Sequence, residues 1–123
     1  MFRVGAKTKT PVHVHIRPGV TGLTEALSLA RETGAALHVV HINSAGLAET
    51  PAMLEMIGVA RWDGQDVTTE AYPYDAGMTE IQSATIQDAY RAAPDDRFAE
   101  LEWPRTGERL TRETFERYRL VGG

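Results

Sequence analysis

The chain has 123 residues, of which 42% are hydrophobic and 24% charged, with a formal net charge of −4 and no cysteine. This composition is typical of an ordinary globular domain. The lack of a basic cluster argues against a nucleic-acid partner, and the lack of cysteine excludes disulfides, thiolate ligands and thiol catalysis. No apolar run approaches the ~20 residues that span a bilayer. We therefore expect a cytoplasmic protein that binds neither membranes nor nucleic acid.

The first half of the chain alternates between strand and helix patterns. Residues 1–10 are polar and turn-like, and apolar and polar residues then alternate over 12–17, which predicts a strand with one apolar face. Apolar residues at helical spacing over 23–30 predict a helix that ends at Gly34. The next segment, 36–43, is more apolar and predicts a strand that is buried on both faces.

A second helix and a third strand follow. The helix is expected to begin at Thr50-Pro51, with threonine as the N-cap and proline in the first turn, and to end at Asp63-Gly64. The third strand covers 66–72. This β-α-β-α-β order predicts an α/β fold with a parallel sheet.

The pattern weakens beyond residue 80. We expect a helix over 80–92, a loop over 94–104 and a short charged helix from Thr111 to Leu120. The chain is accordingly predicted to form a single domain over 1–123. Its core would cover 10–80 and its loop-and-helix extension 81–123.

All four histidines lie in the first two predicted strands. His15 and His41 fall near the carboxyl ends of these strands, where α/β proteins carry their chemistry, and imidazole is the commonest nitrogen ligand of metals. Side-chain alternation places His15, His41 and Tyr72 on one face of the sheet. His13 is expected to fill space or to form hydrogen bonds, and His38 is expected to point toward a helix.

Further polar residues lie just beyond these strand ends, namely Arg17, Asn43, Ser44 and Tyr74. Together with the histidines they suit a metal and an anionic or amide substrate. The role of Glu70 is ambiguous: a buried carboxylate would need a partner, which Arg17 or a nearby histidine could supply. A histidine at a strand end is more often structural than ligating, so the residues alone leave both interpretations open.

Three segments resemble a known family in order and spacing. VHVHIRPG, ALHVVHINSAG and DVTTEAYPYDAGMT are similar to the later part of the amidohydrolase barrel. The most similar branch is the N-acyl-D-amino-acid deacylases (D-aminoacylases), which are related to dihydroorotases and hydantoinases. The resemblance covers about residues 10–80. It implies a fragment of a (β/α)8 TIM-type barrel, corresponding to strands five to seven.

The resemblance also implies a function. It indicates a hydrolase that cleaves a non-peptide C–N bond, with zinc or another divalent metal as cofactor and an N-acyl amino acid or similar small amide as substrate. His15 and His41 would be metal ligands. The residues that would contact the substrate are Arg17, Asn43, Ser44, Tyr72 and Tyr74. Asn43 stands where relatives often carry a lysine. No catalytic residue is assigned, because the family's base is an aspartate of the eighth strand.

Several family features do not occur in this sequence. They are the His-x-His of the first strand, the bridging residue of the fourth and the aspartate of the eighth. A whole barrel takes ~250 residues, and a catalytic zinc takes about three protein ligands. We therefore expect a piece of such an enzyme that is inactive alone and that self-associates through open sheet edges or joins a complementing barrel fragment.

Two alternatives differ in class. The first is a non-catalytic α/β remnant, or an association module without a metal. The second is a small flavodoxin-like domain, which lacks support because no Gly-rich phosphate loop follows a strand.

Overall fold

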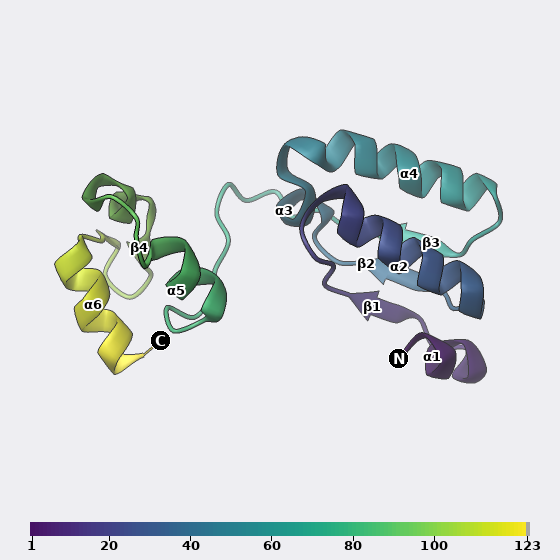
Figure 1. Cartoon of the computed structure of the whole chain (residues 1–123), viewed down its shortest axis with the longest axis horizontal. Helices are drawn as coiled ribbons and strands as arrows, with labels where there is room; N and C mark the ends of the chain where they lie inside the picture. The colour runs from purple at the N-terminus through teal and green to yellow at the C-terminus, as the bar shows by residue number, and fades with distance from the viewer. Residues whose placement is uncertain (123) are drawn as a thin grey trace. The chain divides into compact units, whose positions relative to one another are not determined.

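The computed structural model describes residues 1–122. Contacts divide the chain into two compact units, Met1–Asp75 and Ala76–Gly123 (Figure 1), and each unit has a hydrophobic core of its own. The division falls in the polar loop that follows the third predicted strand. That the whole chain forms one partial domain stays a prediction.

The first unit is built on a three-stranded parallel sheet. Its strands are β1 (Val12–Val14), β2 (Leu37–Val39) and β3 (Val67–Thr69), in the order β1-β2-β3. This confirms the predicted α/β class and the parallel β-α-β-α-β unit, and the arrangement is compatible with a fragment of a TIM barrel. Each strand has only three residues, so all three are shorter than the alternation predicted.

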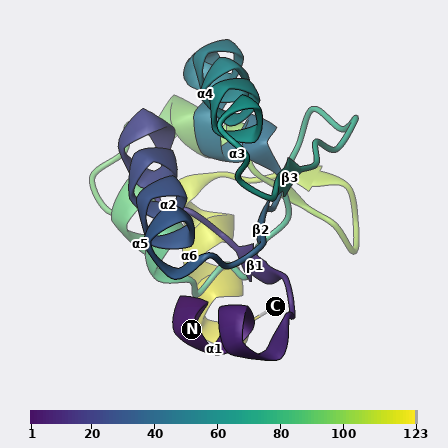
Figure 2. The ribbon, with the colours of Figure 1, turned by 90° about the vertical axis from the view of Figure 1, so that its right-hand side faces the viewer.

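Two helices, α2 (Gly19–Thr33) and α4 (Thr50–Trp62), cover one face of this sheet (Figure 2). The core between the layers is apolar because each layer contributes one stripe. Its fully buried members are Leu23, Leu37, Val39, Ile42, Met53 and Val67. The expectation that the second strand is buried on both faces is wrong, since His38 occupies the face away from the helices.

The helix ends agree with the sequence in part. Gly34 closes α2 in the left-handed conformation, with φ 71°, as predicted. Thr50, however, is not the N-cap of α4, because the 3-10 helix η1 (Leu47–Glu49) runs directly into α4. Thr50 therefore has helical φ and ψ of −50° and −44°, whereas a capping side chain requires an extended backbone.

The predicted turn-like start of the chain is instead a helix, α1 (Phe2–Thr8). The helix contacts the start of β1 at Gly5, where an added Cβ would lie 2.4 Å from Val12 Cγ2. Only glycine permits this approach. Packing of Phe2 against the core stabilises a segment whose own sequence is too short and polar to be helical alone.

The second unit surrounds a small aromatic core. Its elements are α5 (Ala84–Tyr90), η2 (Asp95–Glu100), the antiparallel pair β4 (Glu102–Trp103) and β5 (Glu108–Arg109), and α6 (Arg112–Val121). The segment 94–104, predicted to be a loop, therefore contains a 3-10 helix and a short strand. Thr111 caps α6 as predicted and forms a reciprocal capping box with Thr114. Among the described residues, no helix is long and apolar enough to cross a membrane.

Candidate functional site

The structure brings the two predicted metal ligands together at the carboxyl edge of the sheet. His15 follows β1 directly, and His41 stands two residues beyond β2, at the N-cap of the short helix α3 (Ile42–Gly46). Their ring centroids are 4.4 Å apart, with an interplanar angle of 74°. Two imidazoles from neighbouring strands therefore lie edge to face.

The backbone turn at His41 produces this arrangement. His41 has φ 36° and ψ 59°, a left-handed conformation that residues with a side chain adopt infrequently. Its N–H donates to Glu70 Oε1 at 3.3 Å, and the Ile42 N–H donates to the Glu70 carbonyl at 2.9 Å. The Ser44 hydroxyl lies 2.8 Å from His41 Nδ1. Ser44 therefore engages one ring nitrogen, which leaves Nε2 to meet a ligand.

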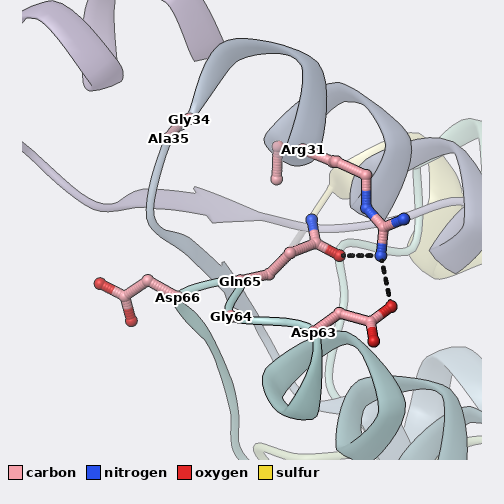
Figure 3. Close-up of a pocket in the computed structure, with 8 residues that line it drawn as sticks. Arg31, Gly34, Ala35, Asp63, Gly64, Gln65 and Asp66 are labelled. Atoms are coloured by element: carbon pink, nitrogen blue, oxygen red, sulfur yellow. Dashed lines mark hydrogen bonds and ion pairs between the residues drawn. The ribbon is translucent and has the colours of Figure 1, made fainter.

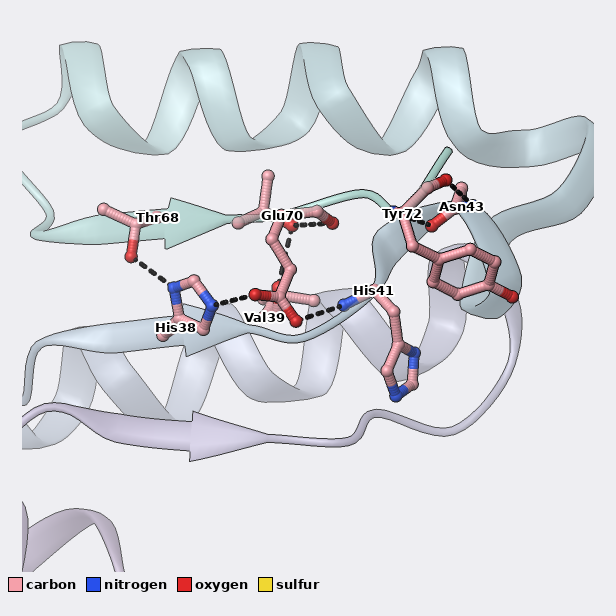
Figure 4. Close-up of polar contacts among 8 residues, drawn as sticks. His38, Val39, His41, Asn43, Thr68, Glu70 and Tyr72 are labelled. Carbon is pink, nitrogen blue, oxygen red and sulfur yellow. Dashed lines mark hydrogen bonds and ion pairs between the residues drawn. The ribbon is translucent and has the colours of Figure 1, made fainter. Parts of the chain in front are cut away.

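A second histidine pair lies beside the first. The rings of His13 and His38 are 4.6 Å apart. His38 Nδ1 lies 2.8 Å from the Thr68 hydroxyl, and His38 Nε2 lies 3.5 Å from Glu70 Oε2 (Figure 4). Glu70 thus contacts both the ring of one histidine and the backbone of the other, and it links the two pairs.

The prediction that His38 points toward a helix is wrong. The register pairs His13 with His38 and His38 with Thr68, so these side chains share the open face, while Val39 is buried beneath the helices. The prediction assumed that side chains alternate between the two faces of the sheet as far as His41. The strand ends at Val39, and the left-handed turn resets the alternation, so that His38 and His41 both reach the polar side.

The sequence held a signal for this register. The segments Val-His-Val of β1 and Leu-His-Val of β2 have the same pattern, and alignment of their apolar positions pairs the two central histidines. Glu70, whose role the sequence left ambiguous, is exposed, with 55% of its side chain accessible. Of its two expected partners, a histidine is the one found.

Only some of the other predicted site residues lie near the His15–His41 pair. Tyr72 lies 6.4 Å from the His41 ring and 6.4 Å from Tyr74, measured between centroids. The Asn43 amide donates to the Tyr72 carbonyl at 3.1 Å and accepts from the Tyr72 N–H at 3.4 Å. It thereby fixes the chain after β3 to α3. Arg17 forms an exposed ion pair with Glu25 of α2.

The donor set is smaller than the metal that the resemblance implies would require. Within residues 1–122, no group of three or more His, Asp or Glu side chains is placed to hold a metal ion. A catalytic zinc takes about three protein ligands and a structural zinc four. The His15–His41 pair thus provides two nitrogen donors, which is fewer than a complete site needs.

A hollow at the opposite edge of the sheet offers no competing site. It lies where α2 and α4 end and is lined in part by Arg31, Asp63 and Gln65 (Figure 3). Arg31 contacts Asp63 at 3.0 Å and Gln65 at 3.4 Å, and Gln65 donates to the Leu27 carbonyl at 3.0 Å. These polar groups satisfy one another and tie the two helix ends together.

The chain is similar to one class of characterised enzyme. Over 68 residues it is 35% identical to a dihydroorotase of Syntrophobacter fumaroxidans (strain DSM 10017 / MPOB), a match that covers 55% of this chain and 14% of the dihydroorotase. The chain thus spans about one seventh of the length of this relative. No family model and no solved structure matches the chain.

This similarity supports the amidohydrolase superfamily and does not extend to the D-aminoacylase branch. Members of the superfamily generally use divalent metals.

Proposed function

We propose that this chain is a segment of a metal-dependent amidohydrolase that cleaves the C–N bond of a small amide, with N-acyl amino acids as the substrate class. His15 and His41 would supply two ligands of a zinc or similar divalent ion. The observation that carries the proposal is the 4.4 Å approach of their rings at the carboxyl ends of adjacent parallel strands, where such enzymes place their chemistry.

The residues around the pair support this role. When bound, the metal would supply an activated water and polarise the amide carbonyl. Ser44 orients the His41 ring through Nδ1, as outer partners of metal-ligating histidines do. Tyr72 and Tyr74 would form an aromatic wall for the substrate. Asn43 keeps one N–H and one acceptor position beyond its bonds to Tyr72. Arg17 would offer charge to a substrate carboxylate only on leaving its ion pair with Glu25.

The two-donor set favours a second candidate, a non-catalytic association module that binds no metal. Zinc titration by calorimetry separates the two. For the metal-site proposal we expect saturable zinc binding that weakens by at least about tenfold in both His15→Ala and His41→Ala. His13→Ala is the matched control, because it removes a neighbouring imidazole from the same strand and should leave the affinity unchanged.

Two results would contradict the metal-site proposal. One is no zinc binding by the folded chain, and the other is an equal loss in all three variants. We also expect no amide hydrolysis by the pure chain with zinc, because the catalytic base and further ligands are not among the described residues. Turnover under these conditions would show that the described residues suffice.

A further inference from the structure

Glu70 follows β3 directly and contacts both histidine pairs. Its two carboxylate oxygens have different partners (Figure 4). Oε1 accepts the backbone N–H of His41 at 3.3 Å, and Oε2 lies 3.5 Å from His38 Nε2. A glutamate at a strand end ordinarily extends into water. A carboxylate that instead spans two residues of the neighbouring segment indicates a specific role.

The contact at His41 concerns the turn that presents its ring. The strand β2 ends at Val39, and His41 has a left-handed backbone conformation, which persists only where its surroundings hold it. Glu70 accepts two successive N–H groups of this turn, that of His41 through its side chain and that of Ile42 through its carbonyl. Within residues 1–122 the His41 N–H has no second acceptor. Substitution of Glu70 therefore removes the side-chain contact and keeps the backbone one.

His38 in turn holds the carboxylate. Its side chain is 19% exposed, and its Nδ1 lies 2.8 Å from the Thr68 hydroxyl. Because an ionised carboxylate only accepts hydrogen bonds, a neutral His38 presents Nε2–H to Glu70, and Nδ1 accepts from Thr68. Both ring nitrogens thus face a partner, which leaves neither for a metal. His13 packs against this ring, with 4.6 Å between centroids.

We infer that Glu70 is a positioning residue for the His15–His41 pair and that His38 fixes its carboxylate. The inference rests on the proposed function and names the residues that set the geometry of its site. Without the carboxylate the turn at His41 is held by fewer contacts, and the ring leaves its 4.4 Å approach to His15. Outer partners of metal-ligating histidines change metal affinity by about 10–100-fold. The first histidine pair would bind the metal, and His38 of the second pair supports it.

Nuclear Overhauser effects between the rings of His15 and His41, recorded on the metal-free chain, test the positioning directly. We expect these ring contacts in the parent chain and in Glu70→Gln, whose amide oxygen accepts the same N–H, and their loss in Glu70→Ala. Glu49→Ala is the matched control, because it removes a carboxylate that accepts another backbone N–H of the same unit, that of Val20. Equal ring contacts in the parent chain and in Glu70→Ala overturn the inference.

The tautomer of His38 gives a signature that a general loss of stability would not change. The amide of Glu70→Gln has a single acceptor oxygen, and the His41 N–H can only donate, whereas the His38 ring can change tautomer. We therefore expect Nε2–H in the parent chain and Nδ1–H in Glu70→Gln, as read from long-range proton–nitrogen correlations of the imidazole. An unchanged tautomer overturns the role given to His38.

Zinc titration by calorimetry connects this positioning to the proposed metal site. We expect the affinity to fall by at least about tenfold in Glu70→Ala and in His38→Ala, although neither residue is a ligand. Glu70→Gln should retain most of the parent affinity, because it keeps the acceptor for the His41 N–H. His13→Ala and Glu49→Ala should leave the affinity unchanged.

The outcomes separate this inference from the proposed function. Absence of zinc binding by the folded parent chain overturns the proposed function, and the ring contacts of the metal-free chain then decide the inference alone. Equal zinc affinity in the parent chain and in Glu70→Ala retains the metal site and overturns the positioning role. An equal loss in Glu70→Gln and Glu70→Ala would mean that the carboxylate itself binds the metal, which also overturns that role.

Discussion

His41, a candidate metal ligand, has a strained left-handed backbone conformation. A left-handed residue with a side chain costs on the order of 1–2 kcal/mol, and such strain persists only where its surroundings hold it. Here Glu70 accepts the His41 N–H and Ser44 contacts the ring. The strained turn places the His41 ring against His15, so the strain coincides with the candidate metal pair.

Thr50 provides a prediction at the same scale. Its Oγ1 is buried, with no hydrogen-bond partner among the described residues, and an unpaired buried hydroxyl costs about 1–3 kcal/mol. We expect Thr50→Val to raise the free energy of unfolding by about 1 kcal/mol, as measured by urea denaturation.

Thr69→Val is the control for this substitution. The Thr69 hydroxyl donates to the Val39 carbonyl at 2.8 Å, so the same change should here lower the free energy of unfolding by about 1 kcal/mol. If both variants shift in the same direction, the hydroxyl of Thr50 is not the unsatisfied group that the structure indicates.

Local sequence pattern predicts part of the candidate site. The positions of His15 and His41 at the ends of apolar strands were sufficient to pair them. That His38 and His41 both reach the polar side was not accessible in this way, because it depends on where β2 ends. That end is fixed by Glu70, which lies on β3's continuation and is far from His41 in sequence. A contact at this separation leaves no periodic signal.

At the scale of elements, the two long helices of the first unit depend on each other at their ends. The N-cap of α2 is Pro18, whose side chain forms no hydrogen bond. Glu49 of η1 supplies the missing capping hydrogen bond, since its Oε2 accepts the Val20 N–H at 2.7 Å. A carboxylate at a helix N-terminus also interacts favourably with the helix dipole.

We therefore expect Glu49→Ala to lower the free energy of unfolding by about 1 kcal/mol. Glu49→Gln should retain the acceptor but lose about 0.5 kcal/mol of charge interaction. Glu32→Gln is the contrasting control, because it removes an acidic group from the last turn of α2 and should be neutral or slightly stabilising. Urea denaturation at low and high salt measures both effects, and the Glu49→Gln loss should shrink as salt rises.

Helices with strong end signals were predicted well, and segments stabilised by tertiary contacts were not. Gly34 and Thr111 mark true helix ends because glycine and threonine satisfy the local backbone there. The prediction that Thr50 is an N-cap was wrong, because the preceding 3-10 turn is already helical. The helix α1 has no local signal and forms through its packing against β1, which a single sequence does not display.

At the scale of the whole molecule, the two cores differ in chemistry. The first is aliphatic. The second contains Tyr90, Phe98 and Phe115, whose ring centroids lie 5.2–5.9 Å apart. The Tyr90 hydroxyl donates to Glu100 Oε2 at 3.2 Å. Burial, followed by the hydrogen bond to Glu100 and its negative charge, raises the pKa of Tyr90, and Arg97 partly offsets this rise.

This difference predicts that high pH destabilises the second unit. The pKa of Tyr90 is about 10 in the unfolded chain and higher in the folded chain. The unfolded state therefore releases its proton first, and the contribution of Tyr90 is complete below pH ~10 and lost as pH rises through the folded pKa. We expect the urea midpoint of the second unit, read from Trp103 fluorescence, to fall as the pH rises above about 10.

Tyr90→Phe separates this effect from other alkaline titrations. It removes the ionisable hydroxyl but keeps the ring in the aromatic core, so the alkaline fall should become shallower than in the parent chain. Replacement of Trp62 by phenylalanine leaves Trp103 as the one tryptophan and makes the signal specific to the second unit. An equal alkaline fall with and without the hydroxyl would mean that Tyr90 does not carry the pH dependence. A fall confined to the parent chain would tie it to the Tyr90 hydroxyl, whose ionisation is disfavoured first by burial and then by the hydrogen bond to Glu100 and its charge.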